Sequence, residues 1–282
     1  VNRGLAILGD HVFVGTLDAR LVALNTKDGS VAWEQKLEDW KSAYSSTGAP
    51  LVVGDLVITG IGGAEYGVRG FVQAFKAATG EPVWKTFVIP GPGEPGNDSW
   101  PGETWKTGGA STWQTGAYDA ETRTLLWGTG NPGPWNSDLR KGDNKWSCSL
   151  VAMDVDSGKI KWAFQYTPND AWDYDGNNGP TLLDVTIDGK PRKVVAVPSK
   201  QSWLYVFDRI TGQPIWPINE KPVPQTDMSG EKTAKTQPYP SKPPAFSRTF
   251  VSKDDIIDFT PELRAQALKN LSQFRWEQSE FV

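Results

Sequence analysis

The sequence has little of the chemistry that most hydrolases and metalloproteins use, because its 282 residues include only one cysteine and one histidine. Zinc sites require several Cys or His ligands, and a Ser or Cys nucleophile normally requires a His base. His11 lies in a stretch that alternates like a strand, which predicts a strand-surface residue, and Cys148 is predicted to be a small buried residue. Any chemistry in this chain would therefore depend on carboxylates, amides or a bound cofactor.

Strong charge and long apolar runs are missing as well. The chain has 29 basic and 33 acidic residues, a net charge of -4, and no run of more than two basic residues, which argues against nucleic acid as a partner. No apolar segment approaches the roughly 18 residues of a membrane span. Because the chain begins at Val1 with neither a start methionine nor a signal peptide, we expect a mature or truncated piece.

Tryptophan, in contrast, is abundant, with 14 residues. Four segments read as strand, turn and strand, and each ends on a tryptophan with a glycine four residues earlier. These pairs are Gly29 and Trp33, Gly80 and Trp84, Gly158 and Trp162, and Gly212 and Trp216. A weaker fifth copy ends at Trp127, with Arg123 where the glycine should be, and is expected on a different strand of its sheet. Repeats of this length and pattern predict an all-β fold, a β-propeller.

The repeat has a physical reason. Glycine supplies the positive φ that a hairpin turn requires, and a large flat indole one strand later can fill the space between two neighbouring sheets. We therefore expect these tryptophans to join each blade to the next. They build the fold and need not touch a ligand.

Function is expected in the segments between blades that do not repeat, since such loops at one end of a propeller usually carry it. Residues 169–178 contain Asp173 and Asp175. In an extended backbone, alternate side chains point to one face roughly 6–7 Å apart, so both carboxylates could converge on one hard cation or one reacting centre. The alternative is an Asx-rich surface turn. Glu65 lies in a glycine-rich segment, where it could be a ligand or simply pair with Arg69.

Several motifs occur together and in one order, and by them the chain resembles the quinoprotein alcohol dehydrogenases, the methanol and ethanol dehydrogenase group that uses pyrroloquinoline quinone. They are GTLDARLVAL, GAEYGVRG, GTGNPGPWN, WDYDG and LYVFDRITG. The resemblance implies an eight-bladed propeller about twice as long, of which residues 1–282 would form roughly the middle half of the ring. A vicinal cysteine pair typical of the family would fall before Val1.

The resemblance also implies roles for individual residues. The expected metal ligands are Glu65, Asn131 and Asp173, of which Asp173 is also the expected general base. The residues expected to hold the quinone's carboxylates and carbonyls are Arg3, Thr47, Gly63, Ala64 and Lys200. Trp113 matches the indole on which the quinone ring stacks. Many members have a threonine two residues before this tryptophan, but this chain has Ser111 followed by Thr112, so either hydroxyl could contact the quinone.

Asp175 bears on the identity of the metal. Calcium-type members of the family tend to have a small neutral residue there, whereas lanthanide-dependent members resemble this chain in having a second aspartate. Glu65, Asp173 and Asp175 with Asn131 give a formal ligand charge of -3, and because ligand charge tunes cation preference, we favour a lanthanide(III) over calcium as the metal cofactor. The alternative is that Asp175 faces solvent in the turn.

The composition changes near the C-terminal end. Residues 217–250 are rich in proline and predict a surface loop. Thr260 as N-cap and Pro261 in the first turn then predict a peripheral helix over residues 260–272.

These observations predict oxidation of a small primary alcohol to the aldehyde, with Asp173 as base and a metal-polarised quinone as hydride acceptor. By resemblance, a cytochrome c is the expected electron acceptor, the periplasm is the expected location, and a homodimer is the expected assembly. One alternative is a non-catalytic propeller that binds protein partners. Another is a glycoside-processing propeller that uses paired acids.

Overall fold

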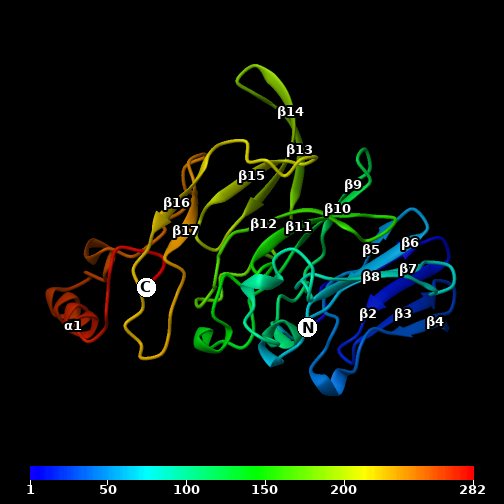
Figure 1. Cartoon of the computed structure of the whole chain (residues 1–282), viewed down its shortest axis with the longest axis horizontal. Coiled ribbons are helices and arrows are strands. Elements are labelled where there is room, and N and C mark those ends of the chain that lie inside the picture. The colour runs from blue at the N-terminus through cyan, green and yellow to red at the C-terminus, as the bar shows by residue number, and fades with distance from the viewer.

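The computed structural model describes residues 1–282 and is built almost entirely from antiparallel sheets that follow one another along the chain (Figure 1). The first sheet comprises β1 (Ala6–Leu8), β2 (His11–Gly15), β3 (Arg20–Asn25) and β4 (Val31–Lys36). The second comprises β5 (Leu51–Val53), β6 (Leu56–Gly60), β7 (Phe71–Lys76) and β8 (Pro82–Phe87). In both, each strand pairs with the next one in sequence.

Two further sheets continue the same pattern. The third comprises β9 (Ala117–Asp119), β10 (Thr124–Gly128), β11 (Ser149–Asp154) and β12 (Ile160–Gln165). The fourth comprises β13 (Thr181–Ile187), β14 (Lys190–Pro198) and β15 (Leu204–Asp208), and a single bridge between Phe207 and Pro214 stands where a fourth strand would pair. Successive four-stranded meanders are blades of a β-propeller, so the predicted fold class is confirmed.

The repeated tryptophans join adjacent blades, as predicted. Trp33 of the first sheet donates its indole N–H to the carbonyl of Ala77 in the second, at 3.0 Å. A Cβ added to Gly80 would lie 2.7 Å from the Trp33 ring, so the indole covers this glycine. The glycine also has φ of 75°. Two reasons therefore require glycine at this position, the positive φ of the turn and the close approach of the neighbouring indole. Only the first reason was evident from the sequence.

The next two interfaces repeat this contact. Trp84 donates to the carbonyl of Val155 at 2.9 Å and its ring lies against Gly158. The Trp162 ring lies against Gly212 of the fourth sheet, where a Cβ would approach it to 2.5 Å. The hydrophobic core accordingly lies between neighbouring sheets. Each sheet thus depends on the next for burial of its apolar face.

The weaker fifth copy of the repeat lies on a different strand, as expected. Trp127 is on β10, inside the third sheet, and is 1% exposed. Its indole donates to the carbonyl of Thr112 at 3.2 Å. Arg123, in place of glycine, has φ of 51°. His11, on β2, is half-buried, and Cys148 is fully buried, in agreement with the sequence analysis.

The C-terminal part differs from the prediction of a plain loop over residues 217–250. Two strands in it, β16 (Ile218–Pro222) and β17 (Thr236–Pro240), pair as a hairpin. Tyr239 of this hairpin packs on Trp203, with ring centroids 4.5 Å apart. The helix α1 (Pro261–Leu271) begins after Thr260, whose hydroxyl accepts a hydrogen bond from the Leu263 amide at 3.3 Å.

The remaining helical segments are short turns of 3-10 type in the loops. They cover Trp40–Ser42, Ala64–Tyr66, Asn97–Ser99, Thr104–Thr107, Ser137–Arg140 and Lys253–Asp255. None of the helices combines the length with the hydropathy that a transmembrane span needs. That residues 1–282 form one partial domain stays a prediction.

Candidate metal and cofactor site

Three of the non-repeating segments meet at one place in the fold, and the one that contains Asn131 connects β10 and β11 within the third sheet instead of lying between blades as expected. The Ala110 amide donates to the carbonyl of Asn131 at 2.8 Å, and the Gly130 amide donates to that of Ser111 at 2.7 Å. The side-chain amide of Asn177 donates to the Ser111 carbonyl at 2.9 Å. Loops that are far apart in sequence are therefore fixed to one another by backbone hydrogen bonds. Four of the predicted site residues lie in these segments, namely Trp113, Asn131, Asp173 and Asp175.

Asp173 and Asp175 converge, but by a different geometry from the one predicted. Both have left-handed backbone conformations, with φ of 62° and 58°, so the segment is a turn and the expected extended backbone was wrong. Their carboxylates nevertheless share a cation. The Lys200 ammonium nitrogen lies 3.1 Å from Asp175 Oδ2 and 3.6 Å from Asp173 Oδ2. It also donates to the Asp173 carbonyl at 2.6 Å.

Asp175 is turned into the protein and toward the Asn131 loop. Its side chain is 12% exposed, and its Oδ1 accepts a hydrogen bond from the backbone N–H of Asn131 at 2.8 Å. Asn131 is itself 2% exposed. The alternative in which Asp175 faces solvent is therefore excluded. Asp173, with 45% side-chain exposure, remains open to a small molecule.

Electrostatics link the acidic residues of this region. Burial raises the pKa of Asp173, and the neighbouring Asp175 carboxylate raises that pKa further, while Lys200 opposes the shift. Asp170 and Glu65 contribute smaller effects of the same sign. A bound cation would relieve this repulsion between carboxylates.

Glu65 is held in a short turn and makes no ion pair with Arg69. The 3-10 turn that contains it lies between Gly63 and Gly67, with φ of 109° and 81°. The Arg69 guanidinium instead donates twice to the Ile89 carbonyl, at 3.1 and 2.6 Å. The proposed pairing of Glu65 with Arg69 is thus excluded. The Glu65 carboxylate stays available for a ligand.

The structure does not gather these acids into a finished metal cage. No group of three or more His, Cys, Asp or Glu side chains is close enough together to hold an ion. The side chains expected as metal ligands nevertheless all offer carboxylate or amide oxygens, which suit a hard cation. In addition, the buried side-chain oxygen of Asn177 has no hydrogen-bond partner. This oxygen and Asp175 Oδ1 each lie 2.9 Å from a Cβ added to Gly130. The residues present therefore fit such an ion.

Several residues expected to hold the quinone are also brought together. The Arg3 amide donates to the Thr47 carbonyl at 3.0 Å, and the Arg3 guanidinium lies over the Trp113 ring, 4.3 Å from its centroid. At Gly63 an added Cβ would lie 2.2 Å from the Ala43 carbonyl oxygen, so only glycine fits. Ala64 is fully buried beside it. The structure therefore places a cation on one face of the indole on which the quinone is expected to stack.

The structure distinguishes the two hydroxyls that precede Trp113. The Thr112 hydroxyl accepts from the Ile61 amide at 2.9 Å and donates to the Phe71 carbonyl, so its hydrogen-bonding capacity serves the second blade. The Ser111 hydroxyl makes no such bonds. Its oxygen lies 2.9 Å from a Cβ added to Gly130, the same distance as Asp175 Oδ1. Ser111 is therefore the hydroxyl that faces the candidate site.

Sequence reasoning missed one residue that organises the site. Asp170 is 1% exposed, and its carboxylate accepts hydrogen bonds from the amides of Trp172 and Tyr174, each at 2.9 Å. An aspartate that binds the amide two residues later is the mark of an Asx turn. The spacing of Asp170 and Trp172 in the printed sequence was therefore the available signal.

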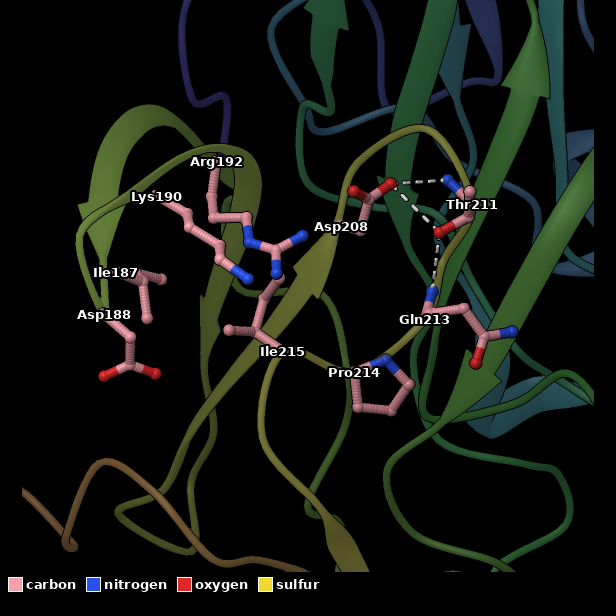
Figure 2. Close-up of a pocket in the computed structure, with 9 residues that line it drawn as sticks. All are labelled: Ile187, Asp188, Lys190, Arg192, Asp208, Thr211, Gln213, Pro214 and Ile215. Atoms are coloured by element: carbon pink, nitrogen blue, oxygen red, sulfur yellow. Dashed lines mark hydrogen bonds between the residues drawn. The ribbon is translucent and has the colours of Figure 1, made fainter.

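A surface pocket of about 400 Å³ lies elsewhere, between the β13–β14 hairpin and the turn after β15 (Figure 2). Figure 2 shows Asp208 accepting hydrogen bonds from the amide and hydroxyl of Thr211, which fixes the turn. Lys190 and Arg192 line the opposite side. None of the predicted site residues lines this pocket. It is separate from the candidate site.

Comparison with known proteins supplies the context. The profile of the PQQ family described as "Glucose/ethanol/alcohol dehydrogenase, beta-propeller domain" matches residues 4–281. The quinoprotein alcohol dehydrogenase PedH of Pseudomonas putida is 44% identical over 230 residues, which are 76% of this chain and 38% of that protein. The lanthanide-dependent methanol dehydrogenase of Methylacidiphilum fumariolicum is 42% identical over 233 residues, with the same two coverages. The chain thus spans about two fifths of the length of these curated relatives.

Solved structures give the same picture. A europium-containing methanol dehydrogenase superposes with a TM-score of 0.71 at 41% identity, over 78% of this chain and 42% of that one. The quinohemoprotein alcohol dehydrogenase from Comamonas testosteroni superposes with a TM-score of 0.73 at 39% identity. That alignment covers 85% of this chain and 38% of the other.

Proposed function

Since this chain belongs to the glucose/ethanol/alcohol dehydrogenase β-propeller family, we propose that the intact protein oxidises a small primary alcohol to the aldehyde. It would use pyrroloquinoline quinone and a hard cation. The observation that carries this proposal is that Lys200 pairs with both Asp173 and Asp175, while Asp175 accepts a hydrogen bond from the backbone amide of Asn131 in another loop. Relatives named as quinoprotein alcohol dehydrogenases support it.

Asp173 is proposed as the general base. Its carboxylate is half-exposed, so an alcohol can reach it, and its pKa is raised by burial and by Asp175. A base with a raised pKa holds the abstracted proton more firmly at neutral pH. Lys200, 3.6 Å away, keeps the carboxylate in place and limits the shift.

The proposed metal ligands are Glu65, Asn131, Asp173 and Asp175. All four offer oxygen, and three carry negative charge, which favours a trivalent lanthanide over calcium. The printed names of a lanthanide-dependent methanol dehydrogenase and a europium-containing one, both similar to this chain, support the choice.

The proposed quinone contacts are distributed over several blades. They are Arg3, Thr47, Gly63, Ala64, Trp113 and Lys200, to which we add the Ser111 hydroxyl. When bound, a quinone polarised by the cation supplies the hydride acceptor. The protein would place Trp113 against the ring and Arg3 and Lys200 beside its charged groups.

Further parts of the proposal follow the family resemblance. The electron acceptor would be a cytochrome c, and relatives named as quinohemoproteins are consistent with electron transfer to haem. A periplasmic location and a homodimer are proposed on the same basis. A scaffold propeller would have no reason to bring Asp173, Asp175 and Asn131 together. A two-acid glycosidase would not require a cation at its acids.

The test is dye-linked oxidation of methanol and ethanol by the intact protein, reconstituted with the quinone and either lanthanum or calcium. We expect activity with lanthanum that largely disappears in Asp175→Ala. Activity with calcium alone would retain the dehydrogenase and reject the trivalent site. Absence of both activity and quinone uptake with either ion would favour the scaffold, and hydrolysis of glycosides after metal removal would favour the glycosidase.

A further inference from the structure

We infer that Arg140 and Asp170 are positioning residues that hold two metal-binding loops at a fixed separation and so set the cation affinity of the site. This inference rests on the proposed function, because it concerns the same site. Neither residue is a proposed ligand, and neither belongs to the repeated blade pattern. Both are almost completely buried, which is unusual for charged side chains.

Arg140 connects the two loops directly. Its guanidinium donates to the carbonyls of Pro134, at 2.7 Å, and Trp135, at 3.3 Å, in the segment that follows Asn131. It also donates to the Asp170 carbonyl at 2.6 Å, at the start of the turn that contains Asp173. A planar fork with five N–H donors can satisfy several acceptors in fixed directions. One buried side chain thus spans the two loops.

Asp170 holds the second loop from inside. Its Oδ1 accepts from the Trp172 amide, and its Oδ2 accepts from those of Tyr174, at 2.9 Å, and Asp175, at 3.4 Å. In this stretch Asp173 and Asp175 adopt left-handed backbone conformations, which cost energy in residues other than glycine. The bonds to Asp170 compensate that cost. They also keep Asp173 and Asp175 in the conformation in which their carboxylates meet Lys200.

The two residues also balance each other in charge. Burial lowers the pKa of Arg140 to about 10, and Asp170 opposes this shift, so Arg140 stays charged at neutral pH. A buried cation is stable only near a compensating negative charge. Loss of the Asp170 charge would therefore loosen Arg140 as well. The pair acts as one unit.

Cys148 offers a graded way to disturb this unit. Its thiol donates to Asp170 Oδ2 at 3.1 Å and is fully buried. Cys148→Ser keeps a donor at this place, whereas Cys148→Ala removes it. Neither change touches a proposed ligand. The two variants differ mainly in the hydrogen bond to Asp170.

The experiment is titration of the intact, metal-free protein with terbium, followed by lanthanide luminescence, together with thermal unfolding of the same samples. Asp170→Asn replaces one carboxylate oxygen with an NH₂ group, which cannot accept hydrogen bonds from the surrounding backbone N–H groups. We therefore expect at least about tenfold weaker terbium binding. Arg140→Lys cannot reach all three carbonyls and should weaken binding similarly. Cys148→Ala should weaken terbium binding a few-fold, and Cys148→Ser should change it little.

The matched control is Asp119→Asn. Asp119 is another buried aspartate, 4% exposed, and it pairs with Arg209 at 3.0 Å in the blades. This variant should lower the thermal stability and leave terbium affinity unchanged. Asp170→Asn with wild-type affinity, or an equal loss in Asp119→Asn, would overturn the inference. If Asp170→Asn does not fold, Arg140→Lys and Cys148→Ala replace it in this test. Wild-type terbium affinity in both variants would then overturn the inference. Wild-type protein that neither binds terbium nor oxidises alcohol would instead overturn the proposed function.

Discussion

The interfaces between blades and the loop cluster around Asp173 are held together in opposite ways. Between blades, an indole such as Trp84 covers a glycine of the next sheet and donates one hydrogen bond to its backbone. In the loop cluster, buried charged groups, Arg140 and Asp170, satisfy scattered backbone carbonyls and amides. The first arrangement is apolar and repeated. The second is polar and occurs once.

This difference separates stability from function. Apolar contacts between sheets are non-directional and add up over the ring, so they stabilise the fold without fixing any particular atom closely. Polar networks are directional and fix positions at the cost of desolvating charged groups. The blades therefore provide a rigid support. The loop cluster uses it to hold Asp173 and Asp175 in conformations that a free chain would rarely adopt.

The largest effect is expected at the exposed carboxylate of the loop cluster. Asp173→Asn should lower the alcohol oxidation rate of the intact protein by about 10²- to 10⁴-fold, or roughly 3 to 5 kcal/mol, because an amide cannot take a proton. The Asp173 side chain is 45% exposed and contacts only Lys200, so the unfolding temperature should hardly change. Steady-state kinetics and thermal unfolding together measure both quantities.

Two results would contradict this prediction. Retention of more than a tenth of the activity would show that another group accepts the proton. A large fall in unfolding temperature would show that Asp173 belongs with the structural residues of its loop. Asp173→Glu is the matched variant, since it keeps a carboxylate and should recover part of the activity unless its extra length displaces the base.

A smaller effect, on stability alone, is expected at a blade interface. In Gly158→Ala the new Cβ would lie 2.5 Å from the Thr86 hydroxyl and 2.6 Å from the Trp84 ring, with φ of 70°. Overpacking and the left-handed backbone should together destabilise the protein by about 2 to 4 kcal/mol. Denaturant unfolding of the intact protein measures this loss.

Gly189 provides the control for that experiment. It has φ of 72°, close to that of Gly158, but a Cβ there meets nothing within 4 Å. Gly189→Ala should therefore show only the backbone term, about 1 to 2 kcal/mol. If the two variants are equally destabilised, the contact between the indole and the glycine contributes nothing, and the blades are joined by other means.

The blade interfaces could be predicted from the sequence more fully than the loop cluster around Asp173. The four glycine and tryptophan pairs depend on a spacing of four residues that recurs, so propeller blades could be predicted from the chain alone. The Asp173 and Asp175 pair was also identified, but as an extended segment. Its left-handed turn depends on Asp170 and on contacts with distant loops, which local spacing does not specify.

Residues that contribute only through distant contacts could not be found this way. Arg140 lies in the loop between β10 and β11, which has no repeat, and its role follows from one carbonyl in a distant loop, that of Asp170, together with those of Pro134 and Trp135 in its own loop. In the hairpin within residues 217–250, Tyr239 packs on Trp203, a residue just before β15. The composition of that stretch, rich in proline, predicted only a loop. Tertiary packing overrode local preference in both cases.

The smallest effects are expected where the two regions meet, at the adjacent residues Ser111 and Thr112. The Thr112 hydroxyl bonds to the Ile61 amide and the Phe71 carbonyl, both in the second blade or beside it. Thr112→Val would leave these buried groups unpaired and should destabilise the protein by about 1 to 3 kcal/mol. Ser111→Ala removes no such bond. It should leave stability nearly unchanged and weaken quinone binding by a few-fold, about 1 kcal/mol.

Denaturant unfolding and quenching of tryptophan fluorescence by added quinone measure the two quantities on the same samples. Reversal of the result, with quinone affinity lost in Thr112→Val and stability lost in Ser111→Ala, would mean that the hydroxyls exchange roles when the cofactor binds. The predicted result would instead show that, of these two neighbouring residues, Thr112 stabilises the fold and Ser111 contributes to quinone binding. That difference follows from the partners of the two hydroxyls, because the one of Thr112 is hydrogen-bonded to the second blade and the one of Ser111 lies near Asp175 and Asn177.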